Sequence, residues 1–206
     1  MKSKATEERF KEIASQYDIL HLATHGIINN DYPMFSKLIF TTSKDSVNEG
    51  FLNTYEIYNM QINAPLVVLS ACNSGFGKLH KGEGIISLSR AFFIAGTKST
   101  VITLWPIADN ASSKLMGNFY TNLAANQNIG DALYHAKLKY LEQCDEMGAH
   151  PNFWAGYIMV GNNALTFEPS KPKTTYYILG IIGLLIVVIL ITYKNRKWRN
   201  NPLRHI

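Results

Sequence analysis

Cysteine is scarce in this sequence, and its scarcity limits the chemistry that can be expected. The 206 residues include two cysteines, Cys72 and Cys144. They lie in different predicted elements and lack the close, repeated spacing of a structural zinc site or a disulfide framework. The sequence therefore predicts neither a metal centre nor a disulfide scaffold.

Uncompensated charge is also absent from most of the chain. The net charge of +5 arises behind residue 193, because residues 1–193 carry 15 basic and 15 acidic side chains. A neutral body with a basic tail favours a membrane surface as partner and argues against nucleic acid. Residues 1–18 are charged and lack the apolar core of a secretion signal, so we expect no export signal within this chain.

One long apolar run stands near the C-terminus. Residues 176–193 form an uncharged stretch of eighteen residues, which is long enough to cover the hydrocarbon core of a bilayer as a helix. Tyrosines at both ends and Trp198 fit interfacial anchors. The alternative is a buried core helix, but every face of the run is apolar. The sequence predicts a linker over 166–175, a transmembrane helix over 176–193 and a basic tail over 194–206.

The remaining chain alternates between short apolar runs and helical periodicity. Such alternation predicts an α/β fold whose mostly parallel sheet has helices on both faces. In these sheets functional groups collect beyond the carboxyl ends of the strands. Strands are expected at 17–23, 66–70, 100–105 and 153–160, a hairpin around 38–40, and helices at 5–15, 54–60, 85–95, from Asp109 or Asn110, and at 129–141.

His25 and Cys72 follow two of the predicted strands. A thiol becomes a good nucleophile when a neighbouring base takes its proton, and a histidine at an adjacent strand end is suited to this. Gly26 allows close backbone approach, and amides near Gly26 and Cys72 are candidates to stabilise an oxyanion. The competing interpretation is that both are ordinary core residues. We expect His21, inside the first strand, to pack under a helix, and Cys144 to be inert.

Several motifs then resemble one known family. The segments DILHLATHG, LVVLSACNSG, GEGIISLSRAFFIAGTKSTVITLWPIAD and HPNFWAGYIMVG, spanning about residues 5–162, are similar to the CHAT domain, a caspase-like peptidase module. The resemblance implies a caspase-like three-layer α/β/α sandwich over residues 1–165. It also implies that His25 is the general base and Cys72 the nucleophile, without a metal or an organic cofactor.

The same resemblance suggests two substrate-binding residues. The LW-x-x-x-D segment is similar to separase, which makes Asp109 a candidate for reading a basic substrate residue. Glu83, in the GEG loop, is an alternative acid. Helix capping is the competing role for Asp109, and a solvated loop charge is the competing role for Glu83.

Parts of the family pattern are missing. The upstream strands and the tetratricopeptide repeats that accompany such domains do not precede residue 5. Three interpretations stay open: a natural fragment, a decayed copy, or a chain that works with an upstream or tetratricopeptide-repeat partner. The leading expectation is a membrane-anchored cysteine endopeptidase acting on a protein or peptide substrate. The alternatives are a catalytically silent interaction module and a small-molecule hydrolase.

We expect a bacterial single-pass protein that lies in the inner or cell membrane. Five basic residues follow the apolar run, which places the tail in the cytoplasm and the domain outside. The expected lack of an export signal places the domain inside. The side of the membrane therefore stays open.

Overall fold

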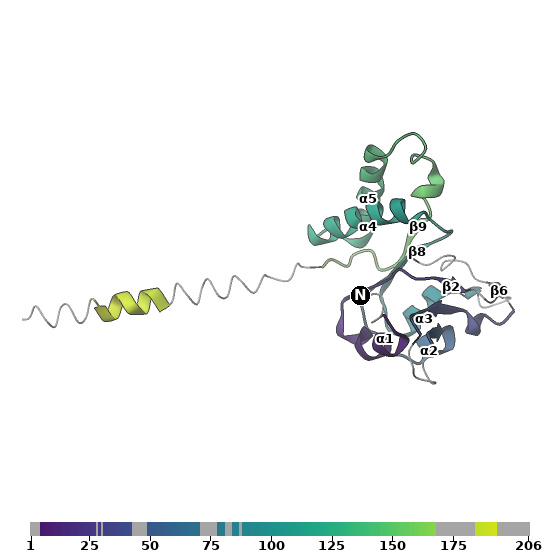
Figure 1. The fold of residues 1–206 in the computed structure, drawn as a ribbon, viewed down its shortest axis with the longest axis horizontal. Coiled ribbons are helices and arrows are strands. Elements are labelled where there is room, and N and C mark those ends of the chain that lie inside the picture. Colours follow the sequence, from purple (N-terminus) through teal and green to yellow (C-terminus); the bar gives the residue numbers. More distant parts are fainter. Residues whose placement is uncertain are drawn as a thin grey trace, which may run out of the picture. The chain divides into compact units, whose positions relative to one another are not determined.

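The computed structural model describes residues 5–27, 29, 31–42, 49–70, 78–80, 84–86, 88–167 and 184–192. The chain divides into two compact units, Met1–Phe167 and Glu168–Ile206. The first unit contains the sheets and the helices that surround them (Figure 1).

A four-stranded sheet forms the centre of the first unit, in the order β1-β5-β8-β9. Its strands are β1 (Ile19–Leu22), β5 (Leu66–Leu69), β8 (Ser99–Thr103) and β9 (Tyr157–Gly161). The first three are parallel, whereas β9 pairs with β8 in the antiparallel direction. The predicted mixed α/β fold with a mostly parallel sheet is therefore confirmed. All four residues of β5 are buried because helices cover both faces of the sheet, as a continuous apolar run indicates.

Helices cover the two faces of this sheet in two groups (Figure 1). On one face, Val67 and Leu69 belong to a core shared with the first three helices; on the other, Leu66 and Val68 belong to a core shared with the last two. The alternation of side chains along β5 thus supplies both cores. The helices are α1 (Glu7–Ile13), α2 (Thr54–Tyr58), α3 (Leu88–Ile94), α4 (Asp109–Ala124) and α5 (Ile129–Gln143), with 3-10 turns η2 (Ala14–Gln16), η3 (Pro33–Phe35) and η4 (Pro151–Phe153).

Two smaller sheets accompany the main one. β2 (Gly26–Ile27), β3 (Lys37–Ile39) and β4 (Phe51–Asn53) form an antiparallel sheet, which includes the predicted hairpin. β6 (Lys78–His80) and β7 (Gly84–Ile86) form a second hairpin. The helix predicted over 85–95 is wrong in its first part, because Gly84–Ile86 pairs with β6 and the helix begins at Leu88.

Three further boundaries differ from the prediction. The helix predicted over 54–60 ends earlier, at Tyr58, and Asn53 caps its start, because Asn53 and Glu56 form a reciprocal capping box. Neither Asp109 nor Asn110 occupies the capping position of α4, which belongs to Ala108. The last strand begins at Tyr157, because Pro151–Phe153 turns as a 3-10 helix instead of extending.

The predicted membrane segment lies largely outside the described residues. Residues 184–192 are helical, and their apolar side chains from Leu184 to Ile191 are exposed. Within the parts of the chain that the structure describes, no helix has both the length and the apolar character needed to cross a bilayer.

Candidate functional site

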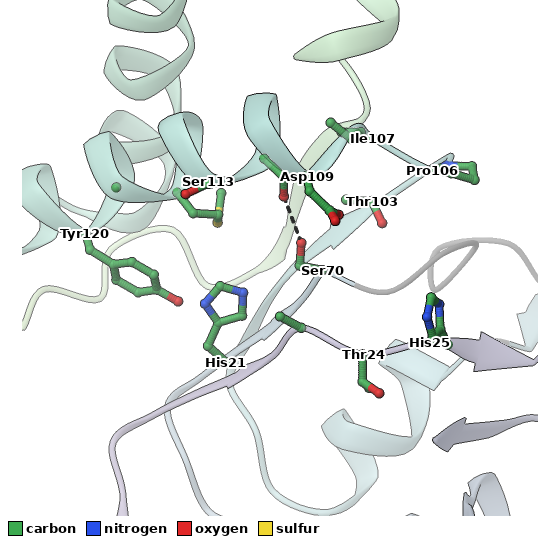
Figure 2. Close-up of a pocket in the computed structure, with 14 residues that line it drawn as sticks. His21, Thr24, His25, Ser70, Thr103, Pro106, Ile107, Asp109, Ser113 and Tyr120 are labelled. Carbon is green, nitrogen blue, oxygen red and sulfur yellow. Dashed lines mark hydrogen bonds between the residues drawn. The ribbon is translucent and has the colours of Figure 1, made fainter. Parts of the chain in front are cut away.

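A cavity of about 670 Å³ opens at the carboxyl ends of the parallel strands (Figure 2). It brings together His25 and Asp109, which the sequence singled out, and it adds Ser70 from the end of β5. The other lining residues come from the end of β1, the end of β8 and the inner face of α4: His21, Ala23, Thr24, Thr103, Pro106, Ile107, Ser112, Ser113, Met116, Gly117 and Tyr120.

His25 is held by its backbone, and its side chain is exposed. The carbonyl oxygen of His25 accepts a hydrogen bond of 2.9 Å from the amide of Ile39, at the end of β3. The hydroxyl of the preceding Thr24 donates to the carbonyl of the same Ile39. The side chain of His25 is exposed and lies at one side of the cavity (Figure 2). An anchored backbone with an exposed imidazole suits proton transfer.

Gly26 directs its amide away from the small sheet. His25 and Ile39 form a hydrogen-bonded pair, so the next pair, Gly26 and Leu38, is of the non-hydrogen-bonded kind. In such a pair the N–H groups point away from the partner strand. Within the described strands, β2 is the last strand on that side of its sheet. The amide of Gly26 therefore faces an open edge next to His25.

The end of β5 lies directly beside the end of β1. The amide of Ser70 donates a 3.0 Å hydrogen bond to the carbonyl of Leu22, three residues before His25. Cys72 follows Ser70 by two residues but lies outside the described residues, and so does Glu83. Because β1 and β5 are parallel, both strands end at the same edge of the sheet, and His25 and Cys72 each follow one of them in sequence.

Asp109 is the first residue of α4, and its side chain is exposed at the cavity. Among the described residues, the carboxylate has no hydrogen-bond or ion-pair partner. Because Ala108 holds the capping position, the capping role considered for Asp109 is wrong. A carboxylate in the first helical turn still interacts favourably with the helix dipole.

His21 lies under a helix, as expected. Its ring packs on Tyr120 of α4, with 5.6 Å between ring centroids. The ring also lines the cavity, which the sequence did not predict (Figure 2). Surrounding protein atoms shield the ring from bulk water, and this desolvation lowers the pKa of His21.

A group of three hydroxyls at the cavity was not foreseen. Ser70 and Ser112 line the cavity, and both contact the hydroxyl of Tyr157 behind them, at 2.6 and 2.5 Å. The two serine hydroxyls are 3.1 Å apart, the contact drawn as a dashed line from Ser70 in Figure 2. These residues are 42 to 87 positions apart in sequence, so no local pattern connects them.

Cys144 stands apart from this cavity. It is half-buried, and its thiol donates to the carbonyl of Leu141 at 3.4 Å. Groups of three or more His, Cys, Asp or Glu side chains suited to a metal ion are absent from the described part of the chain.

The sequence of this chain matches a protein family, and two relatives are similar to it. The CHAT domain family matches residues 1–162. Tetratricopeptide repeat protein 28 of Mus musculus is 27% identical over 204 residues, and its Homo sapiens counterpart is 26% identical over 200 residues. Each alignment covers 82% of this chain but 8% of the relative, so the chain corresponds to a small part of those proteins. With its family match extending from residue 1 to residue 162, this chain belongs to the caspase-like CHAT domain family.

Proposed function

We propose that this protein is a cysteine endopeptidase that uses His25 and Cys72 as a catalytic dyad. The observation that carries the proposal is one cavity, at the carboxyl edge of the sheet, that is lined by His25, Asp109 and Ser70. Ser70 is the described residue nearest in sequence to Cys72, and its amide is bonded to the end of the strand that precedes His25. No metal or organic cofactor takes part in the proposed step.

The reaction follows from the two side chains. His25 takes the thiol proton of Cys72, and the sulfur attacks the carbonyl carbon of the scissile peptide bond. The tetrahedral intermediate collapses as the C–N bond breaks and His25 gives its proton to the leaving amine. Water, deprotonated by His25, then cleaves the thioester, which yields a carboxylate product and the free thiol.

The backbone near His25 supplies the electrostatic stabilisation in this proposal. The amide of Gly26 points away from β3 and is available for the oxygen that becomes negative during attack. The amide of Cys72 is the second proposed donor. Donors fixed in place before reaction stabilise developing charge more than mobile ones do.

Asp109 is the proposed substrate-reading residue. Its exposed carboxylate lines the cavity and has no partner among the described residues, which supports pairing with a lysine or arginine side chain of the substrate. Glu83 is the alternative acid.

Covalent labelling tests the dyad. A peptide acyloxymethyl ketone, which alkylates an activated thiol, is expected to modify Cys72 much faster than Cys144. Cys144 serves as the internal reference, because its half-buried thiol is bonded to a carbonyl. His25→Ala is expected to remove the selectivity while leaving the slow reaction of Cys144 unchanged. Equal, slow labelling of both cysteines in the wild type would refute the enzyme.

A catalytically silent interaction module is the second candidate. The observation in its favour is that both relatives are tetratricopeptide repeat proteins, in which a domain of this size is a small part of a long chain. A repeat-containing partner is proposed for either function. Equal, slow labelling of the two cysteines, together with unimpaired partner binding by Cys72→Ala, is the result expected of the silent module.

Membrane anchoring is part of the same proposal. We propose that residues 1–165 form the catalytic domain, 166–175 a linker, 176–193 a single transmembrane helix and 194–206 a basic tail at the membrane surface. Residues 184–192 are helical, and the exposed apolar side chains of residues 184–191 support this arrangement. The side of the membrane on which the domain lies is left open.

A further inference from the structure

The hydroxyl group of Tyr157 connects the elements that carry the proposed dyad with the helix that carries Asp109. Tyr157 is the first residue of β9 and is fully buried. Its hydroxyl lies 2.6 Å from that of Ser70, at the end of β5, and 2.5 Å from that of Ser112, on α4. With 3.1 Å between the serines, each hydroxyl has two neighbours and can donate one hydrogen bond and accept another.

Each serine is also tied to the candidate site through its backbone. The amide of Ser112 donates to the carbonyl of Ala108 at 2.9 Å and closes the helical turn that contains Asp109. The amide of Ser70 donates to the carbonyl of Leu22 at 3.0 Å, at the end of the strand before His25. The three hydroxyls therefore join the first turn of α4 to the strand ends that precede His25 and Cys72.

We propose that Ser70, Ser112 and Tyr157 are positioning residues, which set the place of the Asp109 carboxylate relative to the reacting thiol. This inference rests on the proposed function. Without the ring of hydrogen bonds, the first turn of α4 loses its side-chain contacts with Ser70 and Tyr157, and Asp109 takes a wider range of positions. Binding of a substrate side chain by charge depends on that position, whereas the chemistry at the thiol does not.

Paired probes separate positioning from general stability. Two dipeptide acyloxymethyl ketones, one ending in arginine and one in leucine, are compared by their second-order rate constants for labelling Cys72. The ratio of these constants measures the preference for a basic residue. Iodoacetamide, which has no peptide part, reports the reactivity of the thiol itself.

The wild type is expected to react faster with the arginine probe. Tyr157→Phe is expected to lower the ratio about tenfold by slowing the reaction with the arginine probe, since small displacements of binding groups cost large factors in rate. Labelling by iodoacetamide is expected to stay unchanged. Tyr140→Phe is the matched control, because Tyr140 is a buried tyrosine of the same core that lies on α5 outside the hydroxyl group. It is expected to keep the wild-type ratio.

Ser112 gives a second route to the same answer if Tyr157→Phe does not fold. Ser112→Ala is expected to lower the ratio, and Ser112→Thr, which keeps the hydroxyl, to restore it. A wild type that prefers arginine, with a ratio that Tyr157→Phe or Ser112→Ala leaves unchanged, overturns this inference and leaves the proposed function standing. A wild type without selective labelling of Cys72 overturns the proposed function and this inference with it.

Discussion

At the scale of single residues, the candidate site combines an exposed histidine with an exposed carboxylate in one cavity. His25 and Asp109 are 84 positions apart in sequence and line the same cavity, because β1 ends and α4 begins at the carboxyl edge of the sheet. The sequence allowed both to be selected: His25 follows a predicted strand, and Asp109 ends an LW-x-x-x-D segment that is similar to separase. Tyr157 was not predictable, because a tyrosine at the start of a strand is usually a core residue and its hydroxyl partners are distant in sequence.

Asp109→Asn is expected to weaken selectivity for basic residues before the cut. In a positional-scanning peptide library, the wild type is expected to favour arginine or lysine, and the variant to lose about tenfold or more of that preference, because the amide carries no charge. Stability is expected to fall by less than about 1 kcal/mol, the size of a helix-dipole interaction. An unchanged preference would remove Asp109 from the substrate-binding residues.

His21 is expected to make the folded state sensitive to acid. Its pKa is lowered by desolvation in the folded protein, so the unfolded chain binds the proton more tightly. The contribution to stability is complete above the usual histidine pKa of about 6.5 and is lost as the pH falls through the window below it. In denaturant unfolding, the free energy of unfolding is expected to fall less between pH 7 and pH 5 in His21→Gln than in the wild type.

The control for this pH experiment is His135→Gln. His135 is exposed on α5 and lies 2.9 Å from the side chain of Gln127. The His135→Gln variant is expected to lose as much unfolding free energy between pH 7 and pH 5 as the wild type. The same loss in His21→Gln as in the wild type would show that His21 is not its source.

At the scale of elements, α1 is fixed to the small sheet by a buried charge. Glu7 is 2% exposed, and one of its carboxylate oxygens accepts hydrogen bonds from the amides of Gly50 and Phe51, at 3.0 and 3.1 Å. Its other oxygen accepts from Lys11 at 2.5 Å. Lys11 also binds Glu56 of α2 at 2.7 Å. Burial alone would raise the pKa of Glu56, but the hydrogen bonds from Lys11 and Asn53 outweigh it and lower that pKa.

Glu7→Ala is expected to destabilise the protein by about 2 kcal/mol, because two backbone amides lose their acceptor and Lys11 loses one of its carboxylate partners. The free energy of unfolding in urea is the measurement. Glu12→Ala is the matched control on the same helix, because the ion pair of Glu12 with Arg9 is exposed and worth less than about 1 kcal/mol. Equal losses in the two variants would contradict the anchoring role of Glu7.

At this scale, the sequence predicted the helices and strands whose conformation follows from their own pattern of apolar residues. The buried strand at 66–69 and the long helices at 109–124 and 129–143 follow from continuous or periodic apolar residues. The strand at 84–86 was not predicted, because its conformation depends on pairing with residues 78–80. The apolar residues at 85 and 86 fit a helix equally well. The antiparallel direction of β9 likewise depends on its pairing with β8.

At the scale of the whole molecule, a three-layer domain is followed by a second unit, residues 168–206. The apolar residues 184–191 of that unit are between 48% and 68% exposed, an arrangement that favours contact with lipid over contact with water. The proposed anchor explains this exposure.

Detergent phase separation tests the proposed anchor. The full chain is expected to enter the detergent phase, and a chain ending at Phe167 to stay in the aqueous phase, because the truncation removes the whole apolar run. Recovery of the full chain in the aqueous phase would contradict the anchor.

The most direct test of the account is peptide turnover by four proteins: wild type, His25→Ala, Cys72→Ala and the double variant. Residues that act as one unit lose as much rate singly as together. The account predicts that the wild type cuts peptides, and that each single variant loses about as much activity as the double variant, by at least about a thousandfold. Peptide cleavage that persists in Cys72→Ala, or losses that multiply in the double variant, would contradict a dyad of His25 and Cys72.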